Sequence, residues 1–131
     1  MELQSKRVAV LVEQQYQEME VWYPIYRLRE AGCTVTVVGP EAGQSYPSKL
    51  GYPCKSDKAA SQCRAEDFDA VVVPGGFAPD FIRRTEAMIR FVSNMAEQGR
   101  VVAAICHGPW VLCSTQEIGR ASCRERVCLY V

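Results

Sequence analysis

Four short apolar runs restrict the fold of this chain more than any other feature of its sequence. They cover residues 8–12, 35–38, 70–73 and 101–105. Almost continuous apolar runs of this length are typical of strands that are covered on both faces, as in parallel sheets, whereas half-exposed strands alternate apolar and polar residues. The sequence therefore predicts a buried, mostly parallel sheet.

Segments with helical periodicity lie between these runs. Apolar side chains recur at helical spacing over residues 20–31, and Gly32 follows as a stop signal. A second helix is predicted from an N-cap at Thr85 to Gly99, and a third begins at Pro109. Alternating strands and helices predict an α/β fold of the doubly wound, flavodoxin-like type, with the sheet sandwiched by helices.

Residues 41–66 interrupt this alternation, because they are polar and rich in turn-forming residues. They are too few for a separate domain. We expect a hairpin or small strands around residues 51–56.

Length and charge exclude several classes of protein. The 131 residues, 48% hydrophobic and 23% charged, are enough for one globular domain with its own core. Fifteen basic residues balance fifteen acidic ones, so no charge excess indicates a nucleic-acid partner. No apolar run approaches the ~20 residues that a membrane span needs, and the N-terminus shows no signal-peptide pattern. We therefore expect a cytoplasmic protein that binds neither nucleic acid nor membrane.

The chain has seven cysteines but only one histidine, His107. The cysteines are scattered, their number is odd, and no Cys-x-x-Cys pair occurs. This pattern fits neither a disulfide framework nor a zinc site, so we expect no metal and no cofactor. Most of the thiols are expected to be small buried groups.

Ligands of open parallel sheets bind beyond the carboxyl ends of the strands. Three of these ends carry unusual residues, at positions 13–20, 74–80 and 106–109. In the second segment, Pro74-Gly75-Gly76 allows the backbone to come close to a ligand. The amides of Gly76 and His107 could then form an oxyanion hole, and a simple turn is the alternative.

The segment Ala104-Ile105-Cys106-His107-Gly108 has the pattern of a nucleophile elbow. Such an elbow places the nucleophile on a sharp turn between a strand and a helix, and it needs small residues two positions before and after. Ala104 and Gly108 meet that requirement. The turn would present the Cys106 sulfur at the start of the next helix, whose dipole favours a thiolate. The structural alternative is a buried cysteine that closes a strand.

Two segments resemble the ThiJ/PfpI family of the class I glutamine-amidotransferase-like superfamily. They are residues 71–80, which contain Pro74-Gly75-Gly76, and residues 103–109, which contain the cysteine. Residues 17–20, followed by a Tyr-Pro pair, resemble the acidic first loop of the family. The resemblance extends from about residue 7 to about residue 115. Within the family, the chain is most similar to the PfpI-type intracellular proteases and deglycases, because a histidine follows the cysteine.

The resemblance implies roles for five residues. Cys106 matches the family nucleophile, His107 its neighbouring histidine, and Gly76 the glycine on the oxyanion side. Glu20 matches a glutamate that reaches the cysteine from the first helix. Asp80 falls where PfpI-type enzymes place an acid, usually Glu, that completes the triad across a subunit interface, which implies a homo-oligomer. A helix-terminal charge at Glu20 and a helix cap at Asp80 are the structural alternatives.

Three functions are consistent with these residues. The first is a PfpI-type cysteine hydrolase, either a peptidase or a deglycase of modified amino groups, which acts on a peptide or a small molecule. The second is a cofactor-free lyase of the glyoxalase or hydratase type on small α-oxoaldehydes, with Glu20 carrying the proton. The third is a non-enzymatic oxidative-stress sensor or chaperone whose Cys106 is oxidised to the sulfinic acid. His107 and Asp80 favour the hydrolase, because a sensor needs no triad.

The resemblance ends near Gln116. Residues 117–131 show neither strand alternation nor a helical stripe, and they look like sequence joined to a shortened gene. We therefore expect a domain at residues 1–116, incomplete at its C-terminus, and a non-native tail at residues 117–131. Activity would then belong to the longer parent, and this chain would be inactive by itself.

Overall fold

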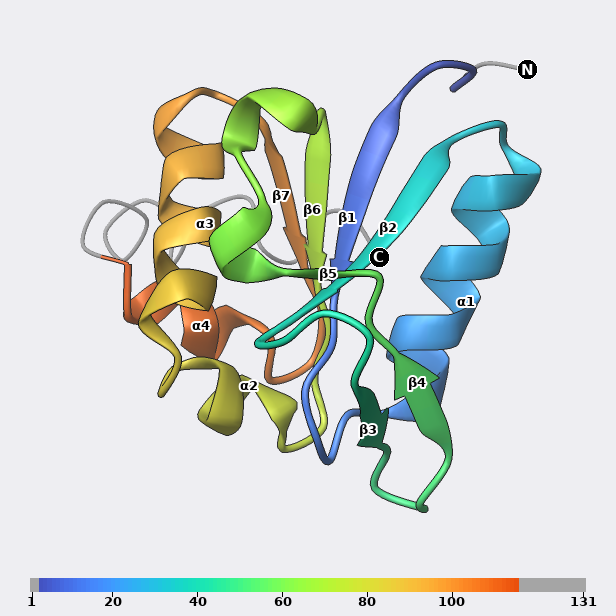
Figure 1. Ribbon diagram of the computed structural model, residues 1–131, viewed down its shortest axis with the longest axis vertical. Helices are drawn as coiled ribbons and strands as arrows, with labels where there is room; N and C mark the ends of the chain where they lie inside the picture. Colours follow the sequence, from blue (N-terminus) through green and yellow to red (C-terminus); the bar gives the residue numbers. More distant parts are fainter. Residues whose placement is uncertain (1–2, 116–131) are drawn as a thin grey trace.

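A computed structural model describes residues 3–115 (Figure 1), and the tail expected at residues 117–131 lies outside the described residues. The main sheet has five strands in the order β5-β2-β1-β6-β7, and every pairing between neighbours is parallel. The strands are β1 (Arg7–Leu11), β2 (Thr34–Gly39), β5 (Lys58–Ala59), β6 (Ala70–Val73) and β7 (Val101–Ala104). The predicted α/β class with a mostly parallel sheet is confirmed.

Helices cover the sheet from both sides. Helix α1 (Glu18–Glu30) packs against β1 and β2, and α3 (Glu86–Glu97) packs against β6 and β7 on the opposite side (Figure 1). The short helices α2 (Ala78–Ile82) and α4 (Pro109–Cys113) contact each other, and two 3-10 turns, Ala60–Gln62 and Ala65–Asp67, join β5 to β6. The apolar runs supply the sheet side of the core, as predicted, but the fourth run is less buried than its pattern indicates. Its strand β7 lies at the edge of the described sheet, and Val101 is exposed.

The irregular segment contains the expected hairpin. Strands β3 (Ser45–Pro47) and β4 (Pro53–Lys55) pair antiparallel, and the hairpin lies beside the first turn of α1 at the lower right of Figure 1. The loops that follow β1 and β6 end at this same lower edge, together with α2 and α4. The carboxyl ends of the central strands therefore open onto one region.

Helix α1 begins two residues earlier than its periodicity predicts. The side chain of Gln17 caps it, since its Oε1 accepts a hydrogen bond from the Glu20 amide at 3.1 Å. Pro24 consequently lies inside the helix, where it has no N–H to donate to the carbonyl of Glu20. The buried side chains of Val21 and Ile25 hold the helix against the sheet despite this lost bond.

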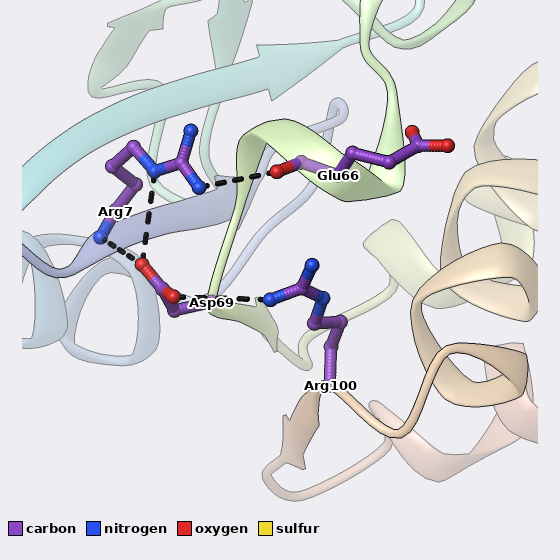
Figure 2. Close-up of polar contacts among 4 residues, drawn as sticks. All are labelled: Arg7, Glu66, Asp69 and Arg100. Carbon is purple, nitrogen blue, oxygen red and sulfur yellow. Dashed lines mark hydrogen bonds and ion pairs between the residues drawn. The ribbon is translucent and has the colours of Figure 1, made fainter.

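A polar cluster ties together the opposite, amino-terminal ends of three strands (Figure 2). The Asp69 carboxylate accepts a hydrogen bond from the Arg7 amide at 2.8 Å, and it lies 3.7 Å from Arg7 Nε and 3.9 Å from Arg100 Nη1. Arg7 Nη2 also donates to the carbonyl of Glu66. Because Arg7, Asp69 and Arg100 begin or precede β1, β6 and β7, the cluster fixes the ends of these strands away from the region described below.

None of the helices in the described part of the chain is long and apolar enough to cross a membrane.

Candidate functional site

The turn after β7 has the geometry of an elbow. Cys106 has a φ of +58°, in the left-handed region that a residue with a side chain rarely occupies. Gly108 fills the tightest part of the turn, because a Cβ at this position would lie 2.5 Å from the carbonyl oxygen of Val73. Ala104 is buried and pairs with Val73 in the sheet. The requirement for small residues on both sides of Cys106 therefore has a visible steric cause.

Glu20, Gly75 and the Cys106 turn meet at one point. A Cβ on Gly75 would lie 2.5 Å from Glu20 Oε2, 2.8 Å from Cys106 Cβ and 3.0 Å from the amide nitrogen of His107. The Gly75 amide donates a hydrogen bond to Glu20 Oε2 at 2.7 Å. A glycine is needed here because three groups from α1 and the elbow occupy the space of a side chain. The structure thus places the Glu20 carboxylate and the Cys106 turn around the same glycine.

The contact between Glu20 and the cysteine sulfur remains a prediction. The hydrogen bond that holds the Glu20 carboxylate in the structure comes from the Gly75 amide, and none joins Glu20 to Cys106 Sγ within residues 3–115. Helix α1 supplies Glu20 from its first turn, where a carboxylate also interacts favourably with the helix dipole.

Gly76 locks the loop after β6 onto the loop after β1. It has a φ of +73° and pairs with Tyr16, and a Cβ here would lie 2.6 Å from both Gln15 O and Gln17 N. The amide of Phe77 donates to the carbonyl of Gln15 at 2.9 Å. Sequence reasoning singled out the Gly76 amide for the oxyanion side, and that role stays a prediction, while Gly75 is the glycine whose Cβ position lies beside Cys106. A Gly-Gly pair contains no signal that distinguishes the two.

The two amides predicted to form an oxyanion hole have no protein acceptor in the described part of the chain. Neither the Gly76 nor the His107 amide donates a hydrogen bond to another atom of residues 3–115. The His107 amide lies beside Gly75 and hence beside the Cys106 turn. Their pairing as an oxyanion hole stays a prediction.

His107 is exposed and its ring stands edge-on against Trp110. The ring centroids are 4.5 Å apart and the ring planes form an angle of 80°. The Trp110 amide also donates to the His107 carbonyl at 3.0 Å, which starts α4. Sequence reasoning missed Trp110 as a neighbour of the histidine, although its position three residues later on a predicted helix was the available signal.

Asp80 does not meet His107 through any hydrogen bond or ion pair among residues 3–115. Its carboxylate accepts a hydrogen bond from Arg84 Nη2 at 2.7 Å, and Arg84 lies just after the end of α2. A triad with His107 would therefore need the Asp80 of another protomer, and that role stays a prediction.

The five cysteines in the described part of the chain fall into two groups. Cys33 and Cys54 are buried and Cys63 is half-buried, and burial raises the pKa of all three thiols, that of Cys54 to about 11. Cys106 and Cys113 are exposed. Since the thiolate is the reactive form, burial and a raised pKa disfavour reaction at the first group.

Comparison with known proteins gives consistent matches. The DJ-1/PfpI family profile matches residues 6–123. The Bacillus subtilis protein named "Putative cysteine protease YraA" is 42% identical over 111 residues, which are 85% of this chain and 66% of that protein. A deglycase of Pyrococcus abyssi is 38% identical over 108 residues, 82% of this chain and 64% of its own length. Protein/nucleic acid deglycase 2 of Escherichia coli is 33% identical over 115 residues, which are 87% of this chain and 67% of that protein. The chain thus spans about two thirds of the length of these relatives.

Solved structures match the same part of the chain. A two-domain protein of Anabaena variabilis, with DJ-1/ThiJ/PfpI-like and ferritin-like domains, superposes with a TM-score of 0.82 at 42% identity, over 85% of this chain and 32% of that one. Drosophila melanogaster DJ-1beta superposes with a TM-score of 0.78 at 30% identity, over 85% of this chain and 60% of that one.

Proposed function

The chain belongs to the DJ-1/PfpI family, and we propose that it is a cysteine-dependent hydrolase of the PfpI type, a peptidase or a deglycase of modified amino groups. The observation that carries this proposal is the meeting of Glu20, Gly75 and the Cys106 elbow at one point. The names of the relatives, which include a cysteine protease and deglycases, support it. We assign the activity to residues 1–116 of a cytoplasmic protein, and no role to residues 117–131.

In the proposed mechanism the Cys106 thiolate adds to the carbonyl carbon of the substrate. The negative charge that develops on the carbonyl oxygen is stabilised by the amides of Gly76 and His107, which have no other acceptor in the described residues. The departing amine takes a proton from His107, and water then releases the acyl group from sulfur. Glu20, whose Oε2 lies beside the Gly75 that also borders the Cys106 turn, would exchange a proton with the reacting groups.

We further propose that the active form is a homo-oligomer, because His107 has no acid partner among the described residues of its own chain. Asp80 of a neighbouring protomer would orient it, at the expense of the Arg84 contact. Exposed apolar side chains also gather on α1 and the β3–β4 hairpin, and surfaces of this kind are usually covered by another protein. They are Met19, Tyr23, Tyr26, Leu50 and Tyr52.

The position of Glu20 also favours a second candidate, a cofactor-free lyase on small α-oxoaldehydes. A carboxylate beside the thiol could move a proton between the two carbons of the hemithioacetal that Cys106 forms with the aldehyde, which turns the adduct into a thioester. One water then hydrolyses the thioester, releases the hydroxy acid and restores the Cys106 thiol.

One assay panel separates these candidates. The chain, and a form extended to the length of its relatives, are incubated with methylglyoxal, a glycated peptide and a fluorogenic peptide, each beside Cys106→Ser and Glu20→Gln. A hydrolase releases amine from one of the peptides, and Cys106→Ser abolishes the release. A lyase converts methylglyoxal alone and loses this activity in Glu20→Gln. If neither form acts on any of the three substrates while Cys106 oxidises readily, the sensor function replaces both.

A further inference from the structure

We propose that Lys49 gives the Cys106 site a preference for electrophiles that carry a negative charge, such as a carbonyl compound with a carboxylate group. The inference rests on the proposed function in one respect only, which is that Cys106 is the reacting group.

Lys49 lies in the turn between β3 and β4, and its backbone is joined to the site by one intervening segment. The Lys49 amide donates to the Tyr16 carbonyl at 2.9 Å, and Tyr16 pairs on its other side with Gly76. The neighbouring Gly75 touches the Cys106 turn. Because paired backbones lie about 4.8 Å apart, the Lys49 backbone is about 10 Å from the glycine loop.

The Lys49 side chain points toward this loop. Its Nζ lies 5.4 Å from the centre of the Phe77 ring, and Phe77 directly follows Gly76. The ring is 57% exposed, so its face is available to the ammonium group. The interaction of a cation with an aromatic face holds the charge at the edge of the site.

The turn that carries Lys49 is well fixed. The Glu18 carboxylate bonds the Ser48 hydroxyl and accepts from the Leu50 amide at 3.0 Å, and the Ser48 hydroxyl accepts from the Tyr52 amide at 2.9 Å. The hydrogen bond from Ser48 lowers the pKa of Glu18, so this carboxylate is charged near neutral pH. The negative charge of Glu18 therefore partly offsets the positive charge of Lys49. Within residues 3–115, Lys49 forms no ion pair at contact distance.

A pair of alkylating reagents tests the charge preference without any substrate. Iodoacetate and iodoacetamide transfer similar groups to the same thiol with loss of iodide, but only iodoacetate is negatively charged. Any change in the ionisation of the Cys106 thiol affects both rates equally, so the ratio of the two rates measures the charge around the site alone. A unit charge placed about 10 Å from a thiol changes such a ratio about two- to fourfold at low salt, and the effect decreases with distance.

We expect the ratio of the iodoacetate to the iodoacetamide labelling rate at Cys106 to fall about two- to fourfold in Lys49→Met. The ratio should be unchanged in Lys49→Arg, which keeps the positive charge. It should rise in Glu18→Gln, which keeps the acceptor oxygen for the turn. Lys55→Met is the matched control, since Lys55 is an exposed lysine of β4 in the same hairpin, and it should leave the ratio unchanged. Salt at about 1 M should shrink the effect of Lys49→Met.

An unchanged ratio in Lys49→Met, or an equal fall in Lys55→Met, would overturn the inference. Failure of the proposed function has a different signature, because Cys106 would then react slowly with both reagents relative to Cys113 in the unaltered chain.

Discussion

Three glycines at the site have no space for a side chain, and Gly108 offers a clean test. It has ordinary helical backbone angles, so alanine would be strained there only by steric contact, with its Cβ 2.5 Å from the Val73 carbonyl oxygen and 2.9 Å from that of Ile105. We expect Gly108→Ala to lower the free energy of unfolding by about 2–3 kcal/mol, as overpacking does in other cores. Urea denaturation measures this change, and the labelling rate of Cys106 should change with it.

The matched control is Gly99→Ala. Gly99 has a φ of +69° but no atom within 4 Å of its Cβ position, so only backbone strain of about 1 kcal/mol is expected. Cys106 labelling should be unaltered. If the two variants were equally stable and equally reactive, the steric account of the elbow would be wrong.

Glu13 is a buried carboxyl group that the proposed mechanism does not use. Burial raises its pKa, and the hydrogen bond from the Gln14 amide only partly offsets this. A raised pKa in the folded state means that the charged form costs stability, and that the cost disappears as the pH falls through the folded-state pKa. We therefore expect Glu13→Gln to be more stable than the unaltered chain at pH 8, with a smaller gain at pH 5. Urea midpoints at both pH values test this.

Glu41→Gln is the control for Glu13→Gln, because the Glu41 side chain is exposed. A gain from Glu13→Gln that is the same at both pH values would show that its cause is not ionisation.

At the residue scale, the sequence predicted features that depend on the size of single residues. It did not predict contacts that depend on the three-dimensional path of the backbone. The spacing of Ala104 and Gly108 around Cys106 identified the elbow, because the steric requirement is visible in the residue types. Which of Gly75 and Gly76 faces the cysteine depends on the path of the loop after β1. The contact of Asp80 with Arg84 follows from helical spacing and was missed because α2 was not predicted.

At the scale of elements, the amino-terminal ends of β1, β6 and β7 depend on one carboxylate. The hydrogen bond from the Arg7 amide, with charges of Lys6, Arg7 and Arg100 nearby, lowers the pKa of Asp69 (Figure 2). A lowered folded-state pKa contributes stability above the unfolded-state value of about 4 and loses it as the pH falls further. We expect Asp69→Asn to be less stable than the unaltered chain at pH 7, and the difference to become smaller at pH 3, as measured by urea unfolding.

Asp67→Asn is the control for Asp69, because this exposed neighbour makes no ion pair in the described part of the chain. Equal losses in both variants at pH 7 would argue against a specific role of Asp69 at the strand ends.

Element prediction succeeded where burial repeats along the chain. The apolar runs located β1, β2, β6 and β7, and Thr85 and Gly99 bound α3 as expected. Strand β5 has only two residues and α2 only five, too few for a pattern to show. The start of α1 was misplaced because a glutamine side chain caps it, and glutamine is not among the residues that usually do so.

At the scale of the whole molecule, the proposal requires that two protomers share one triad. Asp80→Asn and Cys106→Ser should each be inactive in the form extended to the length of the relatives. A mixture of the two should regain part of the activity, since one kind of mixed interface contains an intact Cys106, His107 and Asp80. Activity should also fall on dilution below the dissociation constant of the oligomer.

The control mixes Cys106→Ser with Cys106→Ala, which should stay inactive at every ratio. A fully active monomer would contradict the shared site, and so would a mixture that remains inactive while its subunits demonstrably exchange.

The central claim is that Cys106 is the reactive nucleophile of the chain, and the relative reactivity of its thiols tests it most directly. The unaltered chain is labelled with limiting iodoacetamide at pH 7, and peptide mapping gives the rate at each cysteine. We predict that Cys106 reacts first, ahead of Cys113, which is also exposed, while Cys33, Cys54 and Cys63 lag because burial raises the pKa of their thiols. Faster labelling of Cys113 or of a buried thiol would contradict the account.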